Sequence, residues 1–139
     1  MEILITNIIS IASQTFVHFN SDLGDGAGFW MSVVKPLISS RYHVEFHINE
    51  ELIWLDNIGK ADNKMSFIKI HKENIIEIQG KIEKVENFED TEDMENNENI
   101  CFMRLDNSLF MFSCANIPAD FLGYANITVK SLEIYDMNL

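Results

Sequence analysis

The chain has 139 residues, which is the size of one domain and enough to bury a hydrophobic core. Its hydrophobic content of 47% and charged content of 23% are typical of a folded protein rather than a disordered one. The 22 acidic and 10 basic residues give a net charge of −12. Binding to nucleic-acid phosphates or to anionic lipid requires Lys and Arg, so we expect neither as a partner. A chain of this charge would instead attract a basic protein.

No apolar stretch predicts a signal peptide or a membrane helix. Residues 1–16 are apolar, but Glu2 stands where a signal peptide carries basic residues. No apolar run reaches the roughly 18 residues that a membrane helix needs. Cys101 and Cys114 are the only cysteines, which is too few for a disulfide scaffold. We therefore expect a cytoplasmic protein with reduced thiols.

Alternating and apolar segments predict seven to nine β-strands and no long helix. Strands are predicted at residues 3–11, 15–19, 42–48, 52–58, 65–70, 75–85, 100–105, 109–114 and 124–135. Residues 49–51 predict a turn that joins two of these strands into a hairpin. Residues 21–28 contain three glycines and predict a loop. Residues 29–38 either hold a helical turn that ends at Pro36 or form an irregular segment whose aromatic side chains plug one end of a barrel.

Three features suit a small barrel: a bend at Gly80, a connection at residues 115–123 that contains Pro118, and one long loop at residues 86–99. The sequence Asp106-Asn107-Ser108 predicts a hairpin turn, and Cys101 faces either Cys114 or Phe112 according to which two residues form it. In both cases the thiols are buried. Gly80 on the apolar face of a strand predicts a bend or bulge. We expect an all-β protein, or a β-rich one with one short helix, that forms a small closed or partly open antiparallel barrel of Greek-key, OB-like type. We expect residues 1–139 to form one domain.

The most unusual segment is an acidic insert, residues 86–99, between two predicted strands. It contains seven carboxylates and no basic residue, which predicts a mobile, solvated loop. A loop that only improves solubility would not need its charges concentrated in one place. It would also not need the apolar side chains of Phe88 and Met94. Two interpretations of the insert are therefore open: a loop that contacts a partner, and a loop that is only solvated.

The chain shows no catalytic or metal-binding signature. His43 and His47 are four residues apart, which on a strand separates them by about 13 Å, too far to share an ion. Asp22 and Asp25 lack the spacing of a calcium loop. Cysteines within apolar strands are poor nucleophiles because burial raises the thiol pKa. We expect no enzymatic activity, no metal ion and no cofactor.

Two stretches resemble the immunity proteins of bacterial polymorphic toxin systems, including those of contact-dependent growth inhibition. The first is YHVEFHI at residues 42–48, which leads into Leu-Ile-Trp at 52–54, and the second runs from Gly-Tyr at 123–124 to LEIY at 132–135. The resemblance implies a protein that binds a cognate toxin domain, often a nuclease, and blocks its active site.

From the residues themselves we place the binding site on the acidic insert, whose carboxylates would occupy a basic cleft as phosphate surrogates beside apolar contacts. The predicted partner-binding residues are Phe88, Glu89, Asp90, Glu92, Asp93, Glu95 and Trp30. Two other classes stay open. One is an OB-like module for single-stranded nucleic acid or another ligand, which the net charge opposes. The other is an enzyme of unrecognised type, which would need a fixed carboxylate or histidine cluster in a cleft.

Overall fold

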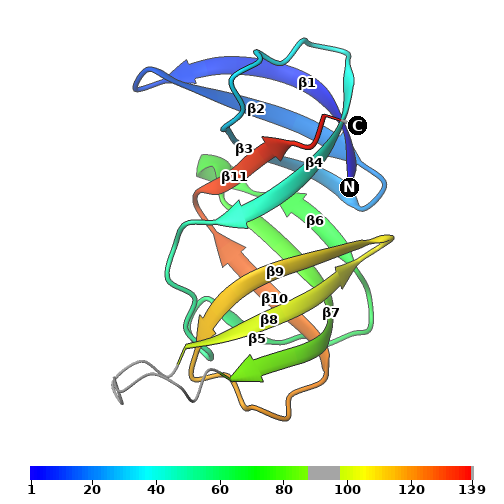
Figure 1. The fold of residues 1–139 in the computed structure, drawn as a ribbon, viewed down its shortest axis with the longest axis vertical. Helices are drawn as coiled ribbons and strands as arrows, with labels where there is room; N and C mark the ends of the chain where they lie inside the picture. The colour runs from blue at the N-terminus through cyan, green and yellow to red at the C-terminus, as the bar shows by residue number, and fades with distance from the viewer. Residues whose placement is uncertain (88–97, 139) are drawn as a thin grey trace.

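The computed structural model describes residues 1–87 and 98–138. These residues form two β-sheets that follow one another along the long axis of the molecule (Figure 1). One sheet closes into a five-stranded barrel and the other stays open, so the predicted all-β fold with a small barrel is confirmed. No helix in the described residues is long and apolar enough to cross a membrane.

The barrel has the strand order of an OB-like fold. Its strands are β1 (Glu2–Ile11), β2 (Gln14–Ser21), β3 (Gly24–Trp30), β4 (Arg41–Ile48) and β11 (Leu132–Asp136). They lie in the order β1-β2-β3-β11-β4, and β4 pairs back with β1. The β3–β11 pair is parallel and the others are antiparallel. The last strand of the barrel in sequence, β11, therefore lies between β3 and β4.

The second sheet is inserted between the fourth and fifth barrel strands. It consists of β5 (Ile58–Lys60), β6 (Phe67–Ile70), β7 (Ile76–Asn87), β8 (Glu98–Leu105), β9 (Ser108–Ala115) and β10 (Gly123–Val129), with the short 3-10 turn η1 (Lys72–Asn74) before β7. The order is β5-β10-β7-β8-β9, and β6 pairs with β7.

This insertion contradicts two sequence predictions. The hairpin between residues 42–48 and 52–58 does not form, because β4 pairs with β11 instead and Ile48 faces Leu132. The predicted strand at 124–135 is two strands, β10 and β11, that belong to different sheets. In the first case a distant strand replaces the neighbour that the local sequence suggested.

Glu50 fixes the place where the chain leaves the barrel and returns to it. Its Oε1 accepts hydrogen bonds from the backbone N–H of Lys130, from the N–H of Ser131 at 2.6 Å and from the Ser131 hydroxyl at 3.1 Å. Glu50 belongs to the outgoing connection, and the other two residues join β10 to β11. The Glu50 carboxylate therefore holds the connection that leaves the barrel beside the connection that returns to it.

The glycine-rich segment is a strand and not the predicted loop. Only Asp22 and Leu23 form a turn, and β3 begins at Gly24. A Cβ atom on Gly24 would lie 2.1 Å from the carbonyl oxygen of Ile68 in β6, and the φ of Gly24 is +127°. The missing side chain therefore lets β6 pass directly against the barrel, as glycine in a strand often does.

Residues 31–40 join β3 to β4 without a helix, so the irregular segment of the two predicted alternatives is the one that forms. Trp30 packs edge-on against Tyr42 with ring centroids 5.0 Å apart. The indole N–H of Trp30 donates to the Val34 carbonyl at 2.8 Å, and the Tyr42 hydroxyl accepts from the Leu37 N–H at 2.9 Å. The two aromatic residues therefore anchor this connection to the barrel.

The β8–β9 hairpin turns at Asp106-Asn107, because Leu105 faces Ser108. Cys101 consequently faces Phe112, which is the second of the predicted registers. Both thiols are buried, as predicted. The hydrogen bond with the Cys114 thiol and the burial together raise the pKa of Cys101 well above its ordinary value.

Candidate functional site

The predicted binding residues of the acidic insert lie outside the described residues. They are Phe88, Glu89, Asp90, Glu92, Asp93 and Glu95. Trp30 is described, and only 6% of its surface is exposed. It lies beneath the connection that it anchors, so its ring is not presented to a partner in this structure. The role of the insert in binding stays a prediction.

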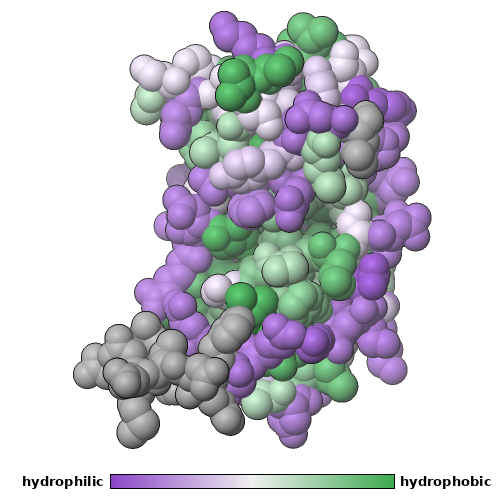
Figure 2. All heavy atoms as spheres, viewed as in Figure 1, coloured by the Kyte–Doolittle hydropathy of each residue, from purple (hydrophilic) through white to green (hydrophobic). Residues whose placement is uncertain are grey.

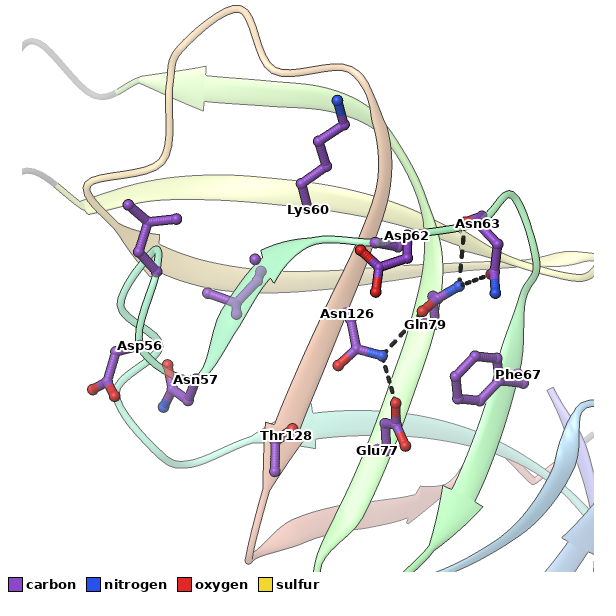
Figure 3. A pocket seen from close by; sticks show the side chains of 14 residues that line it. Asp56, Asn57, Lys60, Asp62, Asn63, Phe67, Glu77, Gln79, Asn126 and Thr128 are labelled. Carbon is purple, nitrogen blue, oxygen red and sulfur yellow. Dashed lines mark hydrogen bonds between the residues drawn. The ribbon is translucent and has the colours of Figure 1, made fainter.

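A polar pocket of about 640 Å³ opens on the second sheet beside β5, β7 and β10 (Figure 3). Asn126 of β10 donates from Nδ2 to Glu77 Oε2 at 2.7 Å and to Gln79 Oε1 at 3.0 Å. Gln79 Nε2 in turn donates to Asn63 Oδ1 at 2.7 Å and to the Met65 carbonyl at 2.9 Å. Neighbouring strands and the connection before β6 are thus joined by one chain of hydrogen bonds.

The carboxylate of Glu77 lies within this network. Its Oε1 is 2.7 Å from His71 Nε2 and its Oε2 accepts from Asn126. Burial raises the pKa of Glu77, but the hydrogen bonds from Asn126 and His71 lower it by more, so the pKa is below its ordinary value. A carboxylate–histidine pair beside a pocket could suggest catalysis. Here both carboxylate oxygens already have partners, and Thr128 is the only hydroxyl group in the pocket lining.

The hydrogen bonds of the polar pocket link β7, β10 and the connection before β6. Gln79 is 4% exposed, and both its amide oxygen and its amide nitrogen have hydrogen-bond partners. Buried polar side chains that are fully satisfied fix one arrangement of the strands around them. Within residues 1–87 and 98–138, no three His, Cys, Asp or Glu side chains are grouped so as to hold a metal ion.

A second cavity separates the barrel from the open sheet, and we name it the β4–β9 groove. It has a volume of about 310 Å³. Its apolar lining comes from both sheets and consists of Met1, Val44, Phe46, Leu105, Leu109, Phe110, Met111 and Met137. Figure 2 shows a hollow with hydrophobic side chains at this place, between the barrel and the second sheet. Leu109 is 45% exposed and Met111 is 54% exposed, so apolar surface is accessible here.

Carboxylates gather around the groove. A smaller cavity of about 220 Å³ adjoins it and shares Met1, His43 and Ser108 with it. The acidic residues that line the two cavities are Glu2, Asp22, Glu45 and Asp106, which we name the acidic rim. No Lys or Arg lines either cavity, but Met1 lines both and its N-terminal ammonium interacts with Glu2 and Glu45, and Arg41 lies 3.3 Å from Glu2, so part of the acidic charge is offset.

The groove also borders an open strand edge. The backbone of Ala115 donates to the Leu52 carbonyl at 2.8 Å and accepts from the Trp54 N–H at 2.9 Å, on the side away from β8. Successive residues of a strand direct their N–H and C=O groups to opposite sides. Leu109, Met111 and Ser113 therefore turn their backbone groups outward, and these groups have no hydrogen-bond partner in the described part of the chain.

Another apolar surface lies on the connection between β3 and β4. Its exposed side chains are Val33 at 99%, Val34 at 66%, Leu37 at 64% and Ile38 at 55%. The segment is fixed, since Ser39 donates from its N–H to the Ile5 carbonyl at 2.8 Å. Lys35 lies in its middle. This surface is apolar, and the one charged residue of the connection, Lys35, is basic rather than acidic.

The outer face of β2 and β3, which binds nucleic acid in OB-type barrels, offers no open aromatic platform here. Phe16 is 3% exposed and packs edge-on against Phe29 at 5.1 Å and against His18 at 5.5 Å. Bases stack on accessible aromatic faces, and these rings are packed against one another instead.

Together these features define a small all-β protein with an OB-like barrel that is enlarged by a second sheet. No family model matches the chain, and no curated protein or solved structure is significantly similar to it. Sequence reasoning did not find the groove, although one signal for it was present. Residues 108–115, SLFMFSCA, contain no charge and no proline, which edge strands commonly carry.

Proposed function

We propose that this chain is a non-enzymatic inhibitor that binds a basic toxin domain and blocks its active site, as the immunity proteins that it resembles do. The β4–β9 groove is the observation that supports this proposal, because an apolar centre is bordered there by the acidic rim. Protein interfaces have this organisation, in which a desolvated apolar centre supplies affinity and a charged rim selects the partner.

The two parts of the surface would act at different stages of binding. A nuclease domain holds phosphates with Lys and Arg, so its cleft is attracted to a chain of net charge −12. Complementary potentials of this kind raise association rates to about 10⁸–10⁹ M⁻¹s⁻¹ at low salt. Leu109 and Met111 would then be desolvated in the complex, which slows dissociation. The protein thereby covers the cleft that the substrate needs.

A growth experiment tests the function. The test first asks whether a reading frame beside the gene for this chain encodes a small basic toxin domain, and that domain is then produced from an inducible promoter, with and without the chain in the same cells. We expect growth only when both are produced, and we expect the two purified proteins to form a complex. Arrested growth in the presence of the folded chain, or the absence of a complex, would refute the proposal.

A pair of charge variants tests whether the acidic rim directs binding. Glu45→Gln with Asp106→Asn removes two charges from the rim, and the control Asp56→Asn with Asp62→Asn removes two from the polar pocket. We expect the rim variant to lower the association rate about tenfold at low salt, and the control to lower it much less. Equal effects would mean that only the total charge matters and would remove the rim from the site.

A further inference from the structure

We propose that the toxin domain is held through an extended segment that pairs with β9 and becomes a further strand of the second sheet. This inference rests on the proposed function and specifies the mode of binding. Strand addition to an exposed sheet edge is a common way to recognise an extended segment, since backbone hydrogen bonds supply affinity and alternate side chains supply specificity.

The outward groups of β9 are arranged for such pairing. Leu109, Met111 and Ser113 lie at alternate positions, so three N–H groups and three C=O groups point to the same side. The chain already uses one end of this edge, where Ile53 forms a parallel bridge with Ala115. An added strand would continue along the remainder of the edge, toward the Asp106-Asn107 turn.

This edge is also unprotected. Proteins usually blunt an exposed edge with charged side chains, proline, a bulge or a very short strand. The eight residues of β9 are SLFMFSCA, and their register with β8 runs without a shift from Glu98 to Leu105. The opposite edge of the sheet, β5, has only three residues, and the barrel is closed. Of the two edges of this sheet, β9 is therefore the long one that remains open, and in the barrel residues 8–11 of β1 also extend past the pairing with β4.

The surroundings of the edge select the chemistry of the segment. Side chains of an added strand point alternately to its two faces. One face would meet the apolar lining around Leu109 and Met111, whereas basic side chains would reach Glu45 and Asp106 at the rim. A second copy of this chain is a poor occupant, because it brings the same acidic rim and the same net charge of −12. The segment that fits is an extended one that alternates apolar and basic residues.

Two synthetic peptides test the charge and the strand pairing together. One is a decapeptide of alternating lysine and valine with blocked ends, and the other carries glutamate in place of lysine. We expect the lysine peptide to bind at least tenfold more tightly by calorimetry. Hydrogen exchange should slow at the amides of Leu109, Met111 and Ser113 when it binds, whereas the amides of Phe110 and Phe112 already face β8. Lack of binding, or binding without this alternating protection, would overturn the inference.

A pair of variants at one position separates backbone from side-chain recognition. Met111→Pro removes the outward N–H, which an edge strand tolerates because no ladder bond within the sheet is lost. Met111→Ala keeps that N–H and removes only the side chain. We expect proline to weaken peptide and toxin binding at least tenfold and alanine less than about threefold. If both variants fold and lose the same binding affinity, strand addition is contradicted. If the proline variant does not fold, the hydrogen-exchange pattern of the unmodified chain decides whether a strand is added.

The outcomes also separate this inference from the proposed function. If the toxin domain is neutralised but the β9 amides stay unprotected in the complex, the inhibitor proposal stands and strand addition is refuted. If no toxin domain is bound, the proposed function fails first. Self-association of the chain with protected β9 amides, detected by sedimentation, would show that the edge serves a second copy and would overturn the basic partner.

Discussion

The substitution Gly80→Ala tests how closely β7 and β8 pack. Gly80 lies on the buried face of β7. A Cβ atom added there would lie 2.6 Å from the carbonyl oxygen of Arg104, 2.7 Å from Met103 Cγ and 2.9 Å from Leu105 Cδ2. These distances are shorter than van der Waals contact, so at least one neighbour has to move.

The nearest of these atoms is the one that can move least. The Arg104 carbonyl belongs to β8, which pairs with β7 through Lys81, and a shift would disturb that pairing. Overpacking of this kind costs about 1–3 kcal/mol. Replacing glycine also restricts the unfolded chain, which returns about 0.4–1 kcal/mol. We therefore expect Gly80→Ala to lower the free energy of unfolding by about 1–2 kcal/mol.

Gly59→Ala is the matched control, because no atom lies within 4 Å of a Cβ added at Gly59. Here only the effect on the unfolded chain operates, so we expect unchanged or slightly increased stability. Urea unfolding followed by tryptophan fluorescence measures both variants, and an unchanged m-value shows that the same surface is exposed. If Gly80→Ala were as stable as the unmodified chain, or if both variants lost the same amount, the close contact would not be real.

Three further predictions concern other parts of the chain. Because the pKa of Glu77 is lower in the folded state than its ordinary 4.5, its contribution to stability is complete above that pH and is lost as the pH falls through the folded pKa. Urea midpoints should therefore fall below about pH 4.5, and Glu77→Gln should flatten this decline; an equal decline in both proteins contradicts it. Glu50→Ala should cost about 1.5 kcal/mol in urea unfolding, since Lys130 and Ser131 lose an acceptor, whereas the exposed Glu51→Ala should change stability by less than about 0.5 kcal/mol. Cys101 and Cys114 are 0% exposed and should react with an aromatic disulfide reagent only when the chain unfolds; a native rate equal to the rate in urea contradicts their burial.

Among the local pairings, the sequence predicted the β8–β9 hairpin, whereas the hairpin that it predicted at residues 49–51 does not form. The strands predicted at residues 3–11 and 15–19 are β1 and β2, which form a hairpin, and the turn at Asp106-Asn107 joins β8 to β9. In both hairpins the partner strand follows at once, so turn residues and alternation carry the necessary information. The all-β composition and the barrel followed from the same local signals.

Distant pairings and the glycine-rich strand were not predictable in this way. Nothing near Ile48 indicates that its partner is Leu132, because the register of such a pair depends on the completed barrel. Gly24 looks like a loop residue until Ile68 is known to lie against it. The groove was missed for the same reason, since Met111 and Glu45 come from different sheets and meet only in the fold. Its one local trace is the absence of charge in residues 108–115.

The position of β11 has a consequence for how the protein is made on the ribosome. This strand completes the barrel by lying between β3 and β4, yet it is translated only after all six strands of the second sheet. Pairings between segments so far apart in sequence form slowly, because much chain must be ordered to bring them together. A growing polypeptide therefore carries four N-terminal strands whose barrel stays unsealed while the inserted sheet emerges and folds. Until β11 pairs with them, β3 and β4 of a newly made chain expose unpaired backbone groups that favour aggregation.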